Sequence, residues 1–333
     1  MRVWTRLENY SKDSRPPLIL ALGNFDGVHT GHQRILRKAV ERAGQLGGVA
    51  AALTFAEHPQ RVLHPTKEPT LLTSPEHRLL LLQGFGIETC FLLSFTISFA
   101  RIDAETFVKE WLVDRLGVRE IHLGYNAHFG FDRKGDSNLM RNLSKQLHFE
   151  FYEADPVEVD GDFVSSTLIR WLIREGKFVK ARDFLGRPFS ILASVIRGSG
   201  RGKALGCPTA NLQPHSEILP PRGVYPAEVR ERSFHLRPAE NGGEFELVDE
   251  KPGPWLHGIL NYGVRPTFGA EGPEVPEVFL LDYSGNLYGK TVEVVFHQKL
   301  RDERTFETPE KLTQAIEGDI AGVKEYFRAL QLE

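Results

Sequence analysis

The chain has 333 residues, of which 41% are hydrophobic and 26% charged, and its formal net charge is −3. This length is about twice that of a common domain, so two domains are expected. The balanced composition excludes a largely disordered or fibrous chain, and neither half is basic enough to favour nucleic-acid binding.

Cysteine content and hydropathy narrow the class of protein further. Cys90 and Cys207 are far apart and form no CxxC motif, which excludes a disulfide framework and a structural zinc site. The longest uncharged apolar stretch, residues 89–100, is too short to cross a hydrocarbon core of about 30 Å. The N-terminus has no hydrophobic signal core. We therefore expect a cytoplasmic protein that contacts no membrane.

Short apolar runs alternate with helical patterns in the first half of the chain. Leu18–Leu22 and Val49–Phe55 are predicted to be buried strands, with a helix over His32–Leu46 between them. A third strand ends at Leu123, and residues 104–116 form another expected helix. The order strand, helix, strand predicts an α/β domain with a parallel sheet.

The motif GNFDGVHTGH lies directly after the first strand and directly before the helix. His29 and His32 are three positions apart, so they can point to one side, and Gly31 lets a phosphate approach the backbone. This HxGH pattern is typical of nucleotidyltransferases, in which imidazoles beside a helix N-terminus can stabilise charge on phosphates. A capped turn with two solvent-facing histidines is the alternative. The candidate nucleotide-binding residues of this motif are Gly23, Asn24, Phe25, Asp26 and Gly31.

Two further blocks of the first half could contribute to the same site. Gly124 and Asn126 follow the third strand, at the end where open α/β sheets bind ligands. Ser166 and Thr167 precede a helical run in which Arg170 is one turn on, and these groups suit triphosphate oxygens. The alternative for the second block is an ordinary N-cap.

The second half consists of short alternating runs separated by Gly and Pro, which predicts a β-barrel or sandwich. The expected strands are Ile191–Ile196, Gly223–Arg230, Glu244–Val248, Glu277–Asp282 and Thr291–Leu300. A final amphipathic helix, capped by Thr308 with Pro309 at its first position, should pack along this domain. The boundary is expected near residue 185, which gives domains 1–185 and 186–333.

A glycine-rich loop precedes the sequence Pro-Thr-Ala-Asn in the second half. Thr209 and Asn211 place two neutral oxygen ligands on one side of an extended segment, where they could bind the Mg²⁺ carried by ATP. Glu277 stands at a strand start, a position that suits a carboxylate base. An ordinary turn and an exposed edge-strand glutamate are the alternatives. The candidate nucleotide-binding residues of the loop are Gly200, Gly202 and Lys203.

Taken in order, these motifs resemble the bifunctional bacterial riboflavin kinase/FAD synthetase family over nearly the whole chain. The resemblance implies a Rossmann-like first domain that joins FMN to AMP from ATP and releases pyrophosphate. It also implies a Greek-key barrel that transfers the γ-phosphate of ATP to the ribityl 5′-hydroxyl of riboflavin, with Mg²⁺. The candidate catalytic residues are then His29, His32, Arg170 and Glu277, with Thr209 and Asn211 as Mg²⁺ ligands.

The chain departs from the family pattern at a few positions. Ala127 stands where an aromatic residue is expected, and Glu57 replaces a proline, which weakens the expectation for adenylyl transfer. Cys207 stands where Phe is usual. The segment 231–254 is long and is expected to form an elaborated hairpin without catalytic residues.

Three alternatives to the bifunctional enzyme remain. The first is a riboflavin kinase whose first domain has lost most adenylyl transfer, and the second is a non-catalytic flavin- or nucleotide-binding regulator. The paired histidines and the set Thr209, Asn211 and Glu277 argue against a regulator, because binding alone requires no base. A fragment of a class I aminoacyl-tRNA synthetase also carries HxGH, but the chain has no KMSKS-like loop.

Overall fold

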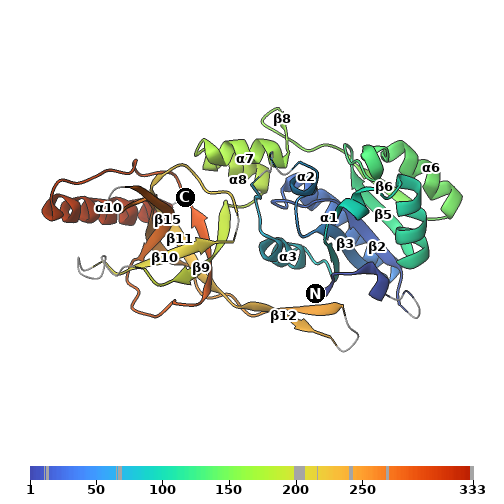
Figure 1. The fold of residues 1–333 in the computed structure, drawn as a ribbon, viewed down its shortest axis with the longest axis horizontal. Coiled ribbons are helices and arrows are strands. Elements are labelled where there is room, and N and C mark those ends of the chain that lie inside the picture. The colour runs from blue at the N-terminus through green and yellow to red at the C-terminus, as the bar shows by residue number, and fades with distance from the viewer. Residues whose placement is uncertain are drawn as a thin grey trace. The chain divides into compact units, whose positions relative to one another are not determined.

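The computed structural model divides the chain into two compact units (Figure 1). Unit 1 consists of Met1–Ser166 and Phe234–Asp249, and unit 2 of Thr167–Ser233 and Glu250–Glu333. This division lies between Ser166 and Thr167, earlier than the boundary expected from the sequence. The described residues are 1–10, 12, 15–64, 66, 70–198, 207–215, 217–239, 243–267 and 270–330.

Unit 1 is built on a sheet with the strand order β12-β13-β1-β4-β3-β2-β5-β6. The six strands from β1 to β6 are parallel, as the sequence predicts, and the hairpin β12-β13 adds antiparallel strands at one edge. The strands are β1 (Arg2–Trp4), β2 (Leu18–Leu22), β3 (Val49–Phe55), β4 (Thr89–Leu93), β5 (Val118–Gly124), β6 (Glu150–Ala154), β12 (Phe234–Pro238) and β13 (Glu244–Asp249). A separate small ribbon pairs β7 (Glu158–Val159) with β8 (Asp162–Phe163).

Helices connect the parallel strands of this sheet. They are α1 (Thr30–Leu46), α2 (Pro59–Leu63), α3 (Pro75–Gly84), α4 (Ile97–Ala100), α5 (Ala104–Thr106), η3 (Phe107–Arg115) and α6 (Ser137–Leu147), with single 3₁₀ turns η1 (Leu7–Asn9) and η4 (Phe131–Arg133). The helix expected over 104–116 is present, but most of it is a π-helix, in which the amide of Leu116 donates to the carbonyl of Trp111. The core cluster on this sheet includes Leu20, Leu53 and Phe91.

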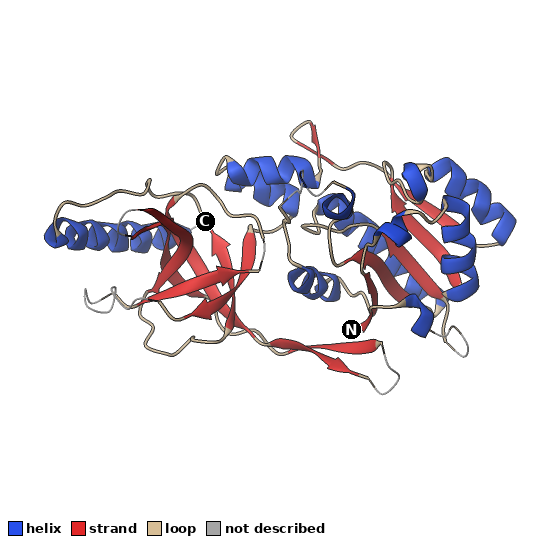
Figure 2. Cartoon of the chain, viewed as in Figure 1, coloured by secondary structure: helices blue, strands red, loops and turns tan. Residues whose placement is uncertain are grey.

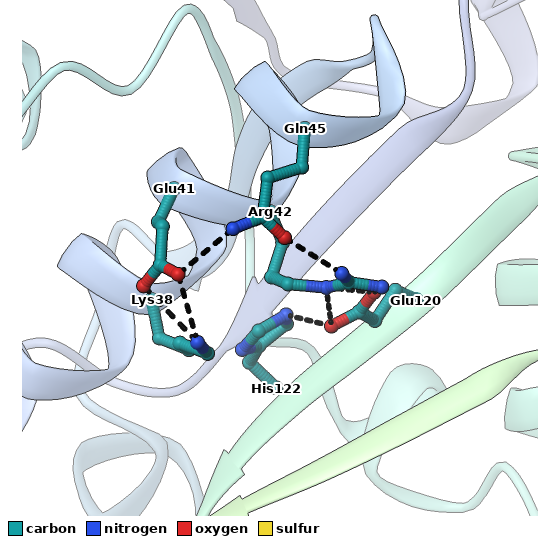
Figure 3. Close-up of polar contacts among 6 residues, drawn as sticks. All are labelled: Lys38, Glu41, Arg42, Gln45, Glu120 and His122. Carbon is teal, nitrogen blue, oxygen red and sulfur yellow. Dashed lines mark hydrogen bonds and ion pairs between the residues drawn. The ribbon is translucent and has the colours of Figure 1, made fainter.

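A network of charged groups joins α1 to β5 (Figure 3). Arg42 of α1 donates from Nε to both oxygens of the buried Glu120, at 3.1 and 2.9 Å. The Nε2 atom of His122 lies 3.0 Å from Oε1 of the same carboxylate, and the His122 side chain is fully buried. Burial lowers the pKa of His122 to about 4 from 6.5, although Glu120 acts in the opposite direction.

This depressed pKa predicts a loss of stability in acid. Between pH 6.5 and about 4 the unfolded chain binds a proton that folded His122 does not, so stability is complete above pH 6.5 and falls as the pH falls. The total loss should be about 3 kcal/mol. Native-state hydrogen exchange of β5 amides at about pH 7 and about pH 4.5 measures it. His122→Gln should reduce the dependence by the share of His122 and leave that of His32, whose pKa is also lowered, whereas the control His148→Asn, at an exposed helix end, should leave the whole dependence. An unchanged slope in His122→Gln would contradict this account.

Unit 2 contains a closed barrel of six antiparallel strands in the order β10-β15-β14-β11-β16-β9 (Figure 2). The α/β plus β fold class inferred from the sequence is therefore confirmed. The strands are β9 (Ser190–Ile196), β10 (Thr209–Pro214), β11 (Gly223–Arg232), β14 (Leu256–Thr267), β15 (Ala270–Leu280) and β16 (Thr291–Phe296). The helices α7 (Ser166–Arg174) and α8 (Phe178–Leu185) precede β9. All residues of these two helices belong to unit 2, except Ser166, which is the last residue of the first segment of unit 1.

The terminal helix α10 (Pro309–Leu330) packs on the barrel, as its amphipathic pattern predicts. Val323 and Phe327 of the helix form a buried cluster with Val224 and Ile259 of the barrel. The Oγ1 atom of Thr308 accepts the amide of Lys311 at 3.3 Å, which confirms the expected N-cap.

One expected barrel strand belongs elsewhere. The segment Glu244–Val248 was assigned to the barrel from its alternating pattern, but it forms β13 in the sheet of unit 1 and pairs with β1. The elaborated hairpin expected over 231–254 is present as β12 and β13. Alternation predicts a half-buried strand but does not specify which neighbour the strand pairs with, and this caused the wrong assignment. Among the described residues no helix combines the length and apolar character needed to span a bilayer.

Candidate functional site

The loop after β2 holds a backbone that side chains rarely adopt. Phe25 and the β-branched Val28 have positive φ angles of 49° and 39°, beside Gly27 at 82°. The Phe25 ring is fully buried and packs against Gly23, where a Cβ atom would lie 3.3 Å from it. Strained conformations of this kind concentrate at functional sites. The loop therefore holds a defined shape between β2 and α1.

His29 and His32 lie together at the start of α1. Their rings stack with centroids 3.6 Å apart, and Nδ1 of His29 accepts the amide of His32 at 3.3 Å. His29 is thus the N-cap of α1, and accepting at Nδ1 places its proton on Nε2. A Cβ atom on Gly31 would lie 3.2 Å from the His29 ring, so the glycine leaves room for the ring. The approach of a phosphate to the backbone at Gly31 stays a prediction.

His32 is held as a neutral imidazole. Burial lowers its pKa well below the ordinary value, and His29 and Arg78 lower it further. Its Nδ1 atom is buried and has no hydrogen-bond partner among the described residues. An uncharged ring with an unsatisfied buried nitrogen is suited to a polar ligand.

Arg78 is a member of this site that the sequence did not identify. It belongs to α3, its side chain is buried, and its Nη1 atom donates to the carbonyl of Phe55 at 2.6 Å and to Oγ1 of Thr54 at 3.2 Å. These contacts hold a cation at the end of β3, within electrostatic range of His32. No local motif surrounds Arg78, so only the packing of α3 identifies it.

Asp26 shapes the loop. Its carboxylate accepts the amides of Leu72 and Thr73, each at 3.0 Å, and the hydroxyl of Thr73 at 3.3 Å. Its backbone carbonyl accepts the Ser166 hydroxyl at 2.9 Å. The carboxylate of Asp26 therefore holds the loop in shape, and its part in nucleotide binding stays a prediction.

The remaining candidates of the first half lie at the carboxyl ends of neighbouring strands or on α7. Asn24 follows β2 and has an exposed side chain, and Gly124 ends β5, the strand that pairs with β2. Asn126 is exposed just beyond Gly124. On α7, Ser166 and Arg170 are four residues apart and share a helix face. Thr167 is adjacent to Ser166 and lies in unit 2 with Arg170.

Glu57 and Ala127, which depart from the family pattern, both make contacts within unit 1. Oε2 of Glu57 accepts the amide of Phe95 at 3.3 Å, which gives the glutamate a contact that the usual proline could not make. Ala127 is partly buried and packs against the core cluster of unit 1.

In the barrel, strand register brings the second set of candidates together. Asn211 of β10 lies directly opposite Glu277 of β15, and Glu277 lies directly opposite Asn261 of β14. Residues opposite one another share a face of the sheet, and so does Thr209, two positions from Asn211. The Thr209 hydroxyl donates to Oε2 of Glu277 at 3.4 Å. Asn261 joins this row through register alone and was not among the candidate site residues.

Asn211 offers an oxygen suited to a cation. Its side chain is buried, and its Oδ1 atom accepts no hydrogen bond from any described residue. A Cβ atom on Gly198 would overlap the Asn211 amide group, so any larger residue there would displace that side chain. Gly200, Gly202 and Lys203 lie outside the described residues. A group of three His, Cys, Asp or Glu side chains able to hold a metal does not occur in the described part of the chain.

A cavity of about 690 Å³ lies away from these candidates, within unit 1. It is lined by residues of β1, of the turn Gly86–Glu88 and of β13, and it contains none of the predicted site residues. Its lining mixes arginine and glutamate side chains and defines no ligand class.

Comparison with known proteins finds two family models, each of which matches a different part of the chain. Residues 11–168 match the family model described as FAD synthetase, and residues 185–327 match the model described as riboflavin kinase. A bifunctional riboflavin kinase/FMN adenylyltransferase of Pseudomonas fluorescens is 36% identical over 306 residues, which cover 92% of each chain. The enzyme of that name from Haemophilus influenzae is 31% identical and covers 93% of this chain and 94% of its own.

A solved structure from Streptococcus pneumoniae has a similar fold. It superposes with a TM-score of 0.79 at 26% identity and covers 97% of this chain and 98% of its own. Its title describes a macrolide-efflux protein, whereas the matching family models describe flavin biosynthesis.

Proposed function

The chain belongs to the bifunctional riboflavin kinase/FMN adenylyltransferase family, and from that premise we propose which of its residues perform each reaction. It is an enzyme of two transferase activities: it phosphorylates riboflavin to FMN with ATP, and it transfers AMP from ATP to FMN to give FAD and pyrophosphate. The observation that supports separate sites is that the histidine pair His29 and His32 lies in unit 1, whereas Thr209, Asn211 and Glu277 lie in unit 2.

We propose that residues 1–185 perform adenylyl transfer and residues 186–333 perform the kinase reaction. The riboflavin kinase match begins at residue 185, which supports this functional boundary. The FAD synthetase match reaches residue 168 and includes Ser166 and Thr167.

In adenylyl transfer, a phosphate oxygen of FMN forms a bond to the α-phosphorus of ATP while the bond to the pyrophosphate oxygen breaks. This exchange needs no covalent protein nucleophile. We propose that His29 donates its Nε2 proton to a phosphate oxygen, and that His32 and Arg170 complete the stabilisation of the developing charge. The neutral state of His32 and the fixed tautomer of His29 support these roles, because neither ring must reorganise during the reaction.

The loop and strand ends would then bind the nucleotide and the flavin. Gly23, Asn24, Gly124 and Asn126 lie at the ends of β2 and β5, where α/β sheets bind ligands. Phe25 and Asp26 contribute by holding the loop in shape, and Gly31 does so by accommodating the His29 ring.

In the kinase reaction we propose that Glu277 removes the proton of the ribityl 5′-hydroxyl as the hydroxyl oxygen attacks the γ-phosphorus of ATP, while the bond from that phosphorus to the bridging oxygen of ADP breaks and ADP leaves. Thr209 and Asn211 would hold Mg²⁺ together with the ATP phosphates, and Gly200, Gly202 and Lys203 would bind the nucleotide. The bound Mg²⁺ would neutralise charge on the phosphates. The unsatisfied Oδ1 of Asn211 supports the fit, because Mg²⁺ prefers oxygen ligands.

Asn211→Ala tests the Mg²⁺ ligands. We expect the Mg²⁺ concentration for half-maximal FMN formation to rise about 10- to 100-fold, because an interaction with a charged group is worth about 1.5 to 3 kcal/mol. Titrating Mg²⁺ at fixed ATP and riboflavin measures the shift.

The matched control is Gln213→Ala, which removes an exposed amide side chain from the same strand, β10. It should titrate as the wild type does. The same titration curve for Asn211→Ala and the wild type would exclude Asn211 as a ligand.

One alternative retains a specific observation in its favour. Ala127 replaces an aromatic side chain of the family pattern, which favours a protein that performs the kinase reaction and only weak adenylyl transfer. We also propose that the protein acts in the cytoplasm, since its reactions require ATP and since Cys90 and Cys207 are both free thiols.

A further inference from the structure

The hairpin β12-β13 is separated in sequence from the rest of its sheet. Its residues lie between barrel strands β11 and β14, yet the hairpin belongs to unit 1. The chain therefore leaves unit 2 after Ser233 and returns to it at Glu250. The match to FAD synthetase ends at residue 168, so this hairpin lies outside it.

The pairing of β13 with β1 is antiparallel and regular. Val3 lies opposite Phe245, with Arg2 opposite Glu246 and Trp4 opposite Glu244. Beyond the ends of this register, the amide of Leu247 donates to the carbonyl of Met1 at 2.8 Å, and the amide of Thr5 donates to the carbonyl of Gly243 at 3.3 Å. The strand β1 thus has a partner on each side, β4 and β13.

Without β13, β1 would be an exposed edge. It has only three residues, of which Val3 and Trp4 are buried, and its outer N–H and C=O groups would lose their partners. Leu247 of β13 is itself 3% exposed, so the hairpin also contributes apolar burial. Glu244 is buried and lies 3.6 Å from Nε of Arg2.

The base of the hairpin is closed within unit 2. The amide of Glu250 donates to the carbonyl of Ser233 at 2.9 Å, and the amide of Gly253 donates to the carbonyl of Glu231 at 3.1 Å. The barrel ends of the hairpin are therefore held together independently of β1. Removing residues 234–249 would leave two ends that a short turn can join.

We propose that the hairpin β12-β13 is a structural part of the adenylyltransferase sheet that is supplied by the kinase half of the sequence. The stability of the sheet in unit 1, and with it the thermal stability of the adenylyltransferase activity, then depends on residues 234–249. The stability of the kinase barrel does not depend on them. This inference rests on the proposed division of the two activities between the halves of the chain. It predicts that residues 1–185 alone lack an edge strand of their own sheet.

Two proline variants of the full chain test the proposal. Hydrogen bonds alternate along an antiparallel pair, and the amide of Leu247 faces β1. Leu236 lies directly opposite Leu247 in the hairpin, and the same alternation turns its amide toward the open edge. Leu247→Pro therefore breaks the pairing with β1, and Leu236→Pro is a matched control that removes no such bond.

The readouts are the thermal inactivation midpoint of each activity and the hydrogen exchange of the Val3 and Thr5 amides, which face β13. We expect Leu247→Pro to lower the midpoint for FAD formation by about 5 to 10 °C and to speed exchange in β1 by about 100-fold. The midpoint for FMN formation should not move, and Leu236→Pro should change neither. Equal losses of both activities, or Val3 and Thr5 amides that remain as protected in Leu247→Pro as in the wild type, would overturn the proposal.

A second variant covers the case in which Leu247→Pro fails to fold. Replacing Phe234–Asp249 with Asn-Gly joins Ser233 to Glu250 and keeps the barrel sequence intact. It should retain kinase activity and lose protection in β1, and loss of the kinase activity would overturn the proposal. Hydrogen exchange requires no turnover, so a wild type that makes no FAD would contradict the proposed function and leave this test valid.

Discussion

Glu277→Ala should reduce the rate of FMN formation from riboflavin by about 10² to 10⁴-fold, the range in which general-base catalysis contributes. The carboxylate accepts the proton of the attacking hydroxyl, and no other carboxylate lies directly opposite Asn211 in the barrel register. The riboflavin concentration for half-maximal rate should change much less, because the base acts mainly in the transition state. Steady-state kinetics with riboflavin, ATP and Mg²⁺ measures both quantities.

Glu277→Gln is the appropriate second variant for this prediction. It preserves the size of the side chain and an oxygen that can accept from the Thr209 hydroxyl, but it removes the base. It should lose nearly as much rate as Glu277→Ala. Both variants should convert supplied FMN to FAD at close to the wild-type rate. Phosphorylation at the wild-type rate in either variant would remove Glu277 from its proposed role.

Loss of either imidazole at the start of α1 should block the second reaction and leave the first, which is the reverse of the effect expected for the Glu277 variants. We expect His29→Asn and His32→Ala to slow FAD formation from FMN by about 10² to 10³-fold, the usual cost of losing one transition-state donor. FMN should then accumulate from riboflavin. Chromatographic separation of riboflavin, FMN and FAD over time measures both steps in one reaction.

The choice of His29→Asn follows from the structure. His29 caps α1 through Nδ1, so replacement by alanine would also remove a cap worth about 1 kcal/mol. Asparagine can accept the same amide while lacking the imidazole, and it separates the catalytic loss from the structural one. His148→Asn, at an exposed helix end in the same unit, is the matched control and should form FAD normally.

The wild-type reaction decides between the bifunctional enzyme and the kinase-only alternative. With excess ATP and added pyrophosphatase, riboflavin should proceed through FMN to FAD. A wild type that stops at FMN would support the alternative suggested by Ala127. A single substitution that abolishes both steps in a folded protein would contradict two separate sites.

Local patterns in the sequence were sufficient for much of unit 1. The strands Leu18–Leu22 and Val49–Phe55 have the bounds predicted from their apolar runs, and α1 begins two residues earlier than expected because His29 supplies the cap. The α/β plus barrel class follows from the change in periodicity along the chain. Such features depend on neighbours within a few positions, which the sequence displays directly.

Long-range packing decided the rest. The sequence places Asp26 in the loop, but only the structure shows that its carboxylate accepts the amides of Leu72 and Thr73, more than forty positions away. Arg78 reaches the site only because α3 packs near the end of β3, and Asn261 joins Glu277 only through strand register. The strand β13 was expected in the barrel and lies in the other sheet. Alternating polarity specifies that a strand has one buried face, whereas its partner is chosen by hydrogen bonding and burial in three dimensions, which no local pattern contains.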